Sequence, residues 1–121
     1  MIGYATLGSN DLERAKGFYD KVLAPLGVER SLDIGRIQFY GKLGTGALAL
    51  CRPYDGQAAT SGNGMMVALA APSREAVDAA YAEAMSAGGT CEGKPGERMP
   101  TFYGAYFRDL DGNKLCIFKL G

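Results

Sequence analysis

The sequence predicts an α+β fold made of two tandem βαβββ units, because residues of the first half recur at fixed distances in the second. Near the start of each half the distance is 62 positions, for Tyr4 and Met66, Leu7 and Leu69, and Gly27 and Gly89. Near the end of each half it is 67 positions, for Leu43 and Leu110, Leu48 and Leu115, and Ala49 and Cys116. Repetition of this length indicates two supersecondary units that bury one core together, with five extra residues in the second.

The first unit, about residues 1–52, begins as a strand and continues as a helix. Residues 1–8 alternate as a strand does, and residues 9–27 change to helical spacing. One helix face carries Leu12, Ala15, Phe18, Tyr19, Val22 and Leu23. Asn10 and Glu13 supply a capping-box start, and Pro25 and Gly27 end the helix. Turn-rich segments then separate three short strands, at residues 28–32, 37–40 and 47–51.

The second unit, about residues 64–121, follows a connector of about residues 53–63 that is rich in Gly, Ser and Asn. A strand at residues 65–71 precedes a helix at residues 74–87, whose N-cap is Ser73. Of the three strands that complete the unit, those at residues 103–108 and 114–120 are clear, and the one near residues 90–100 is weak and contains the five-residue excess. Gly112 suits the positive φ of the turn that joins the last two strands. Together the two units form a single domain, residues 1–121.

Composition narrows the classes of partner. Thirteen basic and thirteen acidic residues balance without forming runs, so nothing indicates nucleic acid or an anionic membrane surface. The three cysteines, together with the lack of a secretory leader or a spanning apolar run, predict free thiols in the cytoplasm. Histidine is absent, which removes the most common transition-metal ligand and general base. A small-molecule ligand or a second copy of the chain is therefore the expected partner.

Strand alternation separates two faces of the predicted sheets. One parity is aliphatic and is expected to lie under the helices: Ala5, Leu7, Leu48, Leu50, Val67, Leu69, Leu115 and Ile117. The other parity mixes apolar, aromatic and polar residues: Ile2, Tyr4, Thr6, Ala47, Ala49, Cys51, Met66, Ala68, Lys114, Cys116 and Phe118. Such a mixture suits the lining of a small-molecule cleft, and packing against another sheet accounts for it equally well.

The paired units, the segment TLGSNDLERAKGFYDKVLAPLG and the closing segment YFRDLDGNKLCIF resemble the vicinal oxygen chelate superfamily over the whole chain. This superfamily includes glyoxalase I, bleomycin-resistance proteins and extradiol dioxygenases. The resemblance implies a curled, open sheet around a cleft, with a divalent metal held by the first and last strands of each unit. The family places His or Glu seven residues before the capping Asp11, which is Tyr4 here, and Glu after DGNKL, which is Cys116 here.

The internal repeat adds two positions to these, so that the four ligand positions implied by the resemblance are Tyr4, Ala49, Met66 and Cys116. None of them is His, Asp or Glu, the ligands that Mn²⁺, Fe²⁺ or Ni²⁺ prefer. The sequence therefore predicts that the family metal site is lost, and it assigns no metal ligand, no cofactor and no catalytic residue. Cys116 could be a nucleophile only if a cation lowered its pKa, and Lys114 is the one candidate nearby in the sequence; a small apolar filler is the alternative.

Arginines and aromatic residues near the open edge are predicted to contact the ligand, because flat rings beside guanidinium groups suit planar or anionic molecules. A rim of solvated surface residues is the alternative. The full set predicted to line the cleft is Tyr4, Arg36, Tyr40, Ala49, Arg52, Tyr54, Met66, Tyr103, Phe107 and Cys116.

Two functional hypotheses follow. The first is a metal-independent protein that binds a small molecule in the sheet cleft, as the bleomycin-resistance branch implies by resemblance. The alternative is a lyase or isomerase of the glyoxalase kind that uses an atypical metal site or metal-free acid and base groups, which leaves open whether the protein is an enzyme. A purely structural role is less consistent with the mixed sheet face. The resemblance to the superfamily implies a homodimer, and two-fold homodimers are also the most common oligomers of soluble proteins.

Overall fold

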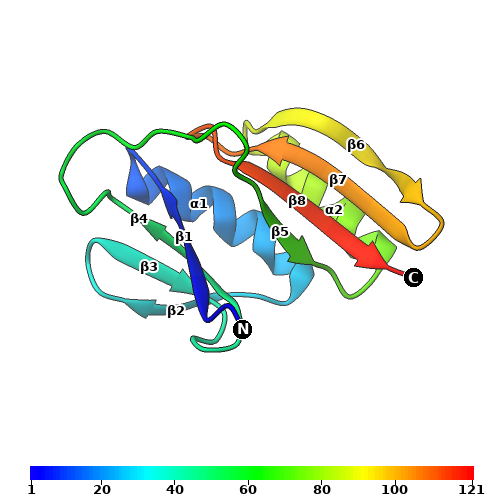
Figure 1. Ribbon diagram of the computed structural model, residues 1–121, viewed down its shortest axis with the longest axis horizontal. Helices are drawn as coiled ribbons and strands as arrows, with labels where there is room; N and C mark the ends of the chain where they lie inside the picture. The colour runs from blue at the N-terminus through cyan, green and yellow to red at the C-terminus, as the bar shows by residue number, and fades with distance from the viewer.

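The computed structural model describes residues 1–121 and contains two consecutive βαβββ units (Figure 1). The first unit consists of β1 (Tyr4–Gly8), α1 (Leu12–Leu23), a 3₁₀ turn η1 (Ala24–Leu26), β2 (Arg30–Asp33), β3 (Ile37–Tyr40) and β4 (Ala47–Cys51). The second consists of β5 (Val67–Ala70), α2 (Arg74–Ser86), β6 (Thr90–Met99), β7 (Phe102–Arg108) and β8 (Lys114–Leu120). The predicted α+β fold with two tandem units is confirmed.

Each unit forms its own four-stranded sheet, in the order β1-β4-β3-β2 and β5-β8-β7-β6. The first and last strands of each unit are parallel, and their registers match across the repeat. Thr6 pairs with Ala49 in the first sheet, and the repeat-related Ala68 pairs with Cys116 in the second. The two repeat spacings found in the sequence therefore relate residues that occupy equivalent backbone positions in the two sheets.

The five extra residues lie in β6, which extends over Thr90–Met99 where β2 covers only Arg30–Asp33. This segment is not a loose insertion but a strand paired with β7, with three irregularities in its register. Figure 1 shows β6 as the outer edge of the second sheet. Its irregular register bends the strand and redirects side chains, as bulges do.

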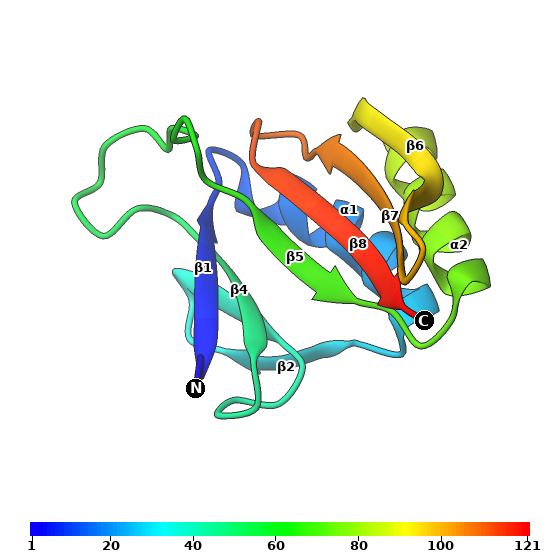
Figure 2. The same cartoon turned by 45° about the vertical axis from the view of Figure 1, so that its right-hand side comes forward.

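Both helices lie on the same side of the strands and pack against each other, so the opposite face of each sheet is left without a helix (Figures 1 and 2). The helix-side core joins the two units in one cluster that includes Leu7, Leu48, Leu50, Leu115 and Ile117. The predicted helix-facing parity is thus correct. We call the opposite side of each sheet its open face.

Side-chain caps fix the starts of both helices. Ser73 caps α2 by accepting a hydrogen bond from the backbone N–H of Ala76 at 3.0 Å, as the sequence predicts. The N-cap of α1 is Asp11 rather than the predicted Asn10, and it accepts from the Arg14 N–H at 3.1 Å. Neither α1 nor α2 has the length and apolar character needed to cross a bilayer.

Candidate functional site

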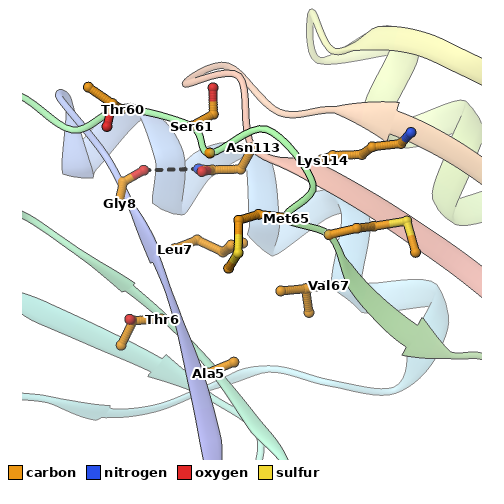
Figure 3. A pocket seen from close by; sticks show the side chains of 12 residues that line it. Ala5, Thr6, Leu7, Gly8, Thr60, Ser61, Met65, Val67, Asn113 and Lys114 are labelled. Atoms are coloured by element: carbon orange, nitrogen blue, oxygen red, sulfur yellow. Dashed lines mark hydrogen bonds between the residues drawn. The ribbon is translucent and has the colours of Figure 1, made fainter.

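A groove of about 420 Å³ lies between the first strands of the two units, β1 and β5 (Figure 3). The two strands belong to separate sheets, so no ladder of backbone hydrogen bonds fills the space between them. Its walls include Thr6 and Leu7 from β1, Met66 and Val67 around the start of β5, and Lys114 from the start of β8. A second hollow of about 400 Å³ continues along the same pair of strands past Ile2 and Ala68.

Hydrogen bonds across the two units close one end of this groove. The side-chain amide of Asn113 donates to the carbonyl oxygen of Gly8 at 2.9 Å, as Figure 3 shows. The backbone N–H of Asn10 donates to Asp111 Oδ1 at 2.9 Å. The β7–β8 turn is thereby attached to the junction of β1 and α1. The volume of the groove is within the range of ordinary small-molecule sites.

The open face of the first sheet is apolar. It carries a small cluster of buried side chains: Ile37, Phe39, Ala49 and Cys51. Tyr4 covers part of this cluster, with its ring at 5.2 Å from the Phe39 ring in an edge-to-face contact. This surface can pack against the flat apolar part of a ligand.

The open face of the second sheet carries positively charged side chains together with aromatic ones, which include the stacked pair Phe102 and Phe118. Tyr106 is directly opposite Cys116 in the β7–β8 register. The Arg98 guanidinium lies 5.4 Å and the Lys114 ammonium 5.9 Å from the centre of the Tyr106 ring. Arg98, Tyr106, Lys114 and Cys116 are called the cationic cluster below. The two open faces therefore differ in chemistry, although their backbones are repeats of each other.

The Cys116 thiol stays protonated despite these cations. Burial raises its pKa above the ordinary value, and this outweighs the lowering by the Tyr106 hydrogen bond and by the charges of Arg98 and Lys114. Burial, together with Cys116, also raises the pKa of Tyr106. Both groups are neutral at pH 7, so neither compensates the charge of Arg98.

We expect alkylation of the native protein to modify Cys91 and to leave Cys116 and Cys51 unmodified on the same timescale. Cys91 is exposed, whereas Cys116 and Cys51 are buried, and only the thiolate reacts. Peptide mapping after iodoacetamide treatment measures this order, and unfolding in guanidinium should make all three cysteines react. Rapid labelling of Cys116 in the folded protein would instead support the nucleophile hypothesis.

The residues at the four family ligand positions do not fit a divalent transition metal. Tyr4 and Met66 are 50% and 45% exposed, and Ala49 and Cys116 are buried. They offer a phenol, a thioether, a methyl group and a protonated thiol, none of which is a good ligand for a hard or borderline cation. No group of three or more His, Cys, Asp or Glu side chains is placed to hold a metal ion elsewhere in the chain. We therefore assign no chemistry to a metal in this protein.

Three of the predicted cleft residues come together in a separate pocket at the end of β4. Arg36 donates to the carbonyl oxygen of Arg52 at 2.8 Å and lies 5.2 Å from the Tyr54 ring centre. The hollow around them has a volume of about 460 Å³ and also includes Ser9 and Asn10. These residues form one group, as the sequence indicates, but they do not line the groove between β1 and β5.

Three other residues that the sequence predicts in the cleft face the helices instead, so their predicted position is wrong. Phe107 is fully buried in the helix-side core because it pairs with Leu115. Tyr40 pairs with Leu48, is also buried, and donates its hydroxyl to Asp20 at 2.9 Å. Tyr103 lies on the same side and donates to Asp78 of α2 at 2.6 Å, with Arg74 over its ring.

Three residues of the open faces are not among those predicted from the sequence: Phe39, Arg98 and Tyr106. The position of Tyr106 could be predicted from the sequence, because a tight turn at residues 109–113 pairs Arg108 with Lys114. That register also pairs Tyr106 with Cys116. The position of Phe39 could be predicted as well, because it precedes Tyr40 on the same strand and therefore lies on the open face when Tyr40 lies on the helix side. No comparable signal exists for Arg98, because its position depends on the irregular pairing of β6.

The fold and site together define a class of protein with two duplicated sheets and a small-molecule-sized groove at their junction. The chain belongs to the Glyoxalase/Bleomycin resistance protein/Dioxygenase superfamily, whose model matches residues 1–117.

Solved structures agree with this assignment. A glyoxalase/bleomycin resistance protein from Albidiferax ferrireducens T118 is 38% identical, with a TM-score of 0.90 and coverage of 98% of this chain and 97% of that one. A glyoxalase/bleomycin resistance protein/dioxygenase family enzyme from Burkholderia phytofirmans PsJN shares the fold at 19% identity, a TM-score of 0.77 and 98% coverage of both chains. Lactoylglutathione lyase from Agrobacterium tumefaciens does so at 24% identity and a TM-score of 0.66, with 98% and 92% covered. No curated protein sequence matches the chain.

Proposed function

We propose that this chain is a metal-independent member of its superfamily that binds a small molecule in the groove between β1 and β5 and on the adjoining open faces. One observation carries the proposal: the groove is present, while the four positions that would hold the family metal are Tyr4, Ala49, Met66 and Cys116. Of the predicted ligand contacts, Met66 lines the groove, and Tyr4, Ala49 and Cys116 remain proposed parts of the site on the adjoining open faces. Arg36, Arg52 and Tyr54 remain proposed contacts in their own pocket.

A thermal-shift screen of neutral, cationic and anionic small molecules, followed by calorimetry, tests the binding function. A ligand at a hundredfold excess over its Kd stabilises the folded state by about 2.7 kcal/mol, which is readily detected. Hits of any charge should be weakened by Met66→Trp, whose larger neutral side chain would fill part of the groove. A flat response across the whole library would count against the proposal.

We expect the purified protein to contain no stoichiometric transition metal, and EDTA to leave both its Tm and its ligand affinity unchanged. Elemental analysis and paired melts with and without chelator measure this. If the protein is instead a metal-dependent enzyme, it should contain stoichiometric metal, and EDTA should lower its Tm or its ligand affinity. A stoichiometric metal that Cys116→Ala or Tyr4→Phe removes would favour a lyase or isomerase with an atypical site.

We also propose a homodimer in the cytoplasm. Several large apolar side chains are exposed on the surface of the chain: Ile2, Tyr4, Leu32, Ile34, Met65, Met66, Met99 and Leu120. Apolar surface of this extent often marks a protein interface. We expect light scattering after size-exclusion chromatography to give twice the chain mass, and Ile34→Lys to shift it toward the monomer. The cytoplasmic location is supported by the three free thiols.

A further inference from the structure

We propose that the cationic cluster on the open face of the second sheet binds the carboxylate group of a small planar organic acid. The inference rests on the proposed small-molecule function and specifies its ligand class. Lys114 belongs both to this cluster and to the groove wall, so the carboxylate end of a ligand in the groove would reach the cluster directly.

The charge balance of this surface leaves Arg98 without an acidic partner. Glu92 is shared by Arg108 at 3.2 Å and Lys114 at 3.6 Å. Glu97, the neighbour of Arg98 in the sequence, pairs with Arg74 at 3.1 Å instead. The only hydrogen bond of the Arg98 side chain is donated to the carbonyl oxygen of Lys94, at 2.6 Å. Most of its five donors remain free for an anion.

Two glycines in β6 leave room for the Arg98 side chain beside the Tyr106 ring. A Cβ atom on Gly96 would lie 2.9 Å from Arg98 Nη1, and one on Gly93 would lie 3.1 Å from Arg98 Nη2 and from the Tyr106 ring. Residues with side chains at these two positions would displace the guanidinium. In the space that the glycines leave, the hydrogen bond to Lys94 and the Tyr106 ring orient Arg98, and an oriented guanidinium loses less freedom on binding.

The chemistry of the neighbouring groups selects a carboxylate. A guanidinium offers paired N–H donors that match the two oxygens of a carboxylate, and Lys114 adds a second cation beside the same ring. Both cations lie within reach of the Tyr106 ring, at 5.4 Å and 5.9 Å from its centre. The apolar open face of the first sheet, with Phe39 and Tyr4, suits the flat body of such an acid.

Three probes of the same shape test the proposal: benzoate, benzamide and benzylamine, titrated into the full chain and followed by NMR. Benzoate should bind about tenfold more tightly than benzamide, the usual advantage of a charge-assisted hydrogen bond, and benzylamine should bind least. Arg98→Gln should abolish the preference for benzoate. Gly96→Ala should also reduce it, although it keeps every charge, because the added methyl group moves the guanidinium.

Lys21→Gln is the matched control, since it removes one positive charge from the last turn of α1, on the other side of the sheet. It should leave the preference intact, and the melting curves of all variants verify folding. Equal binding of benzoate and benzamide, no benzoate binding at millimolar concentration, or a preference unaffected by Arg98→Gln and Gly96→Ala would overturn the inference. The general function would survive such a result if the wider screen yielded neutral or cationic ligands.

Discussion

Asp109→Ala is expected to lower the free energy of unfolding by about 4 kcal/mol, the largest effect of any single polar substitution in this chain. Asp109 is buried and accepts four hydrogen bonds. Its Oδ2 accepts from the Tyr19 hydroxyl at 2.6 Å and from the Asn113 amide at 3.0 Å. Its Oδ1 accepts from the backbone N–H groups of Asp111 and Asn113, both at 2.9 Å. Alanine would leave the buried Tyr19 hydroxyl without its acceptor and release the β7–β8 turn.

Urea unfolding followed by circular dichroism measures this loss. Tyr19→Phe should cost less, about 1–2 kcal/mol, because the turn keeps its other bonds to Asp109. Asp55→Ala is the control, since Asp55 is an exposed acid whose side chain accepts only from the Gln57 N–H, and it should cost less than about 0.5 kcal/mol. A loss below about 1 kcal/mol for Asp109→Ala would mean that the turn does not hold the units together.

Phe107→Ala is expected to destabilise the protein by about 3–5 kcal/mol, the range for truncating a fully buried aromatic residue. Its ring lies 6.3 Å from that of Phe18 of α1, so it joins the second sheet to the helix of the first unit. If Phe107 lined the cleft, its replacement by alanine would alter ligand affinity and leave the free energy of unfolding nearly unchanged. Thermal and urea unfolding therefore distinguish the two locations.

Tyr54→Ala provides the comparison, because Tyr54 is 89% exposed and should cost less than about 0.5 kcal/mol. Phe107→Leu should recover much of the loss by filling part of the cavity. If Phe107→Ala retained wild-type stability, Phe107 would not lie in the helix-side core.

The internal repeat made the fold predictable, because the positions that it relates have the same register in both sheets. Alternation along the parallel strands was equally informative: Leu7, Leu50 and Ile117 lie where their parity places them. Alternation alone failed for the antiparallel strands, where the turn sets the register. Arg36, Gln38 and Tyr40 alternate on β3, but pairing with Leu50 and Leu48 of β4 places Gln38 and Tyr40 on the helix side.

The cationic cluster was less predictable for a different reason. Lys114 and Cys116 were assigned to the open face from their parity, and Tyr106 follows from the turn. The position of Arg98 depends on how β6 bends between its paired segments and on the space left by two glycines. Such a contact arises from tertiary geometry rather than from local pattern, so no rule of strand alternation reveals it.

The attachment of the two sheets at only one end of their junction bears on how ligand preference could change during evolution. Asn113 and Asp111 tie the units together beside Gly8 and Asn10, while the far end, near Ile2 and Ala68, has no such tie. On the helix side the two units are also joined by the packing of α1 and η1 on α2. Substitutions between the helices, remote from any bound molecule, can therefore widen or narrow the entrance and give related proteins different ligand sizes without a change at the contact residues.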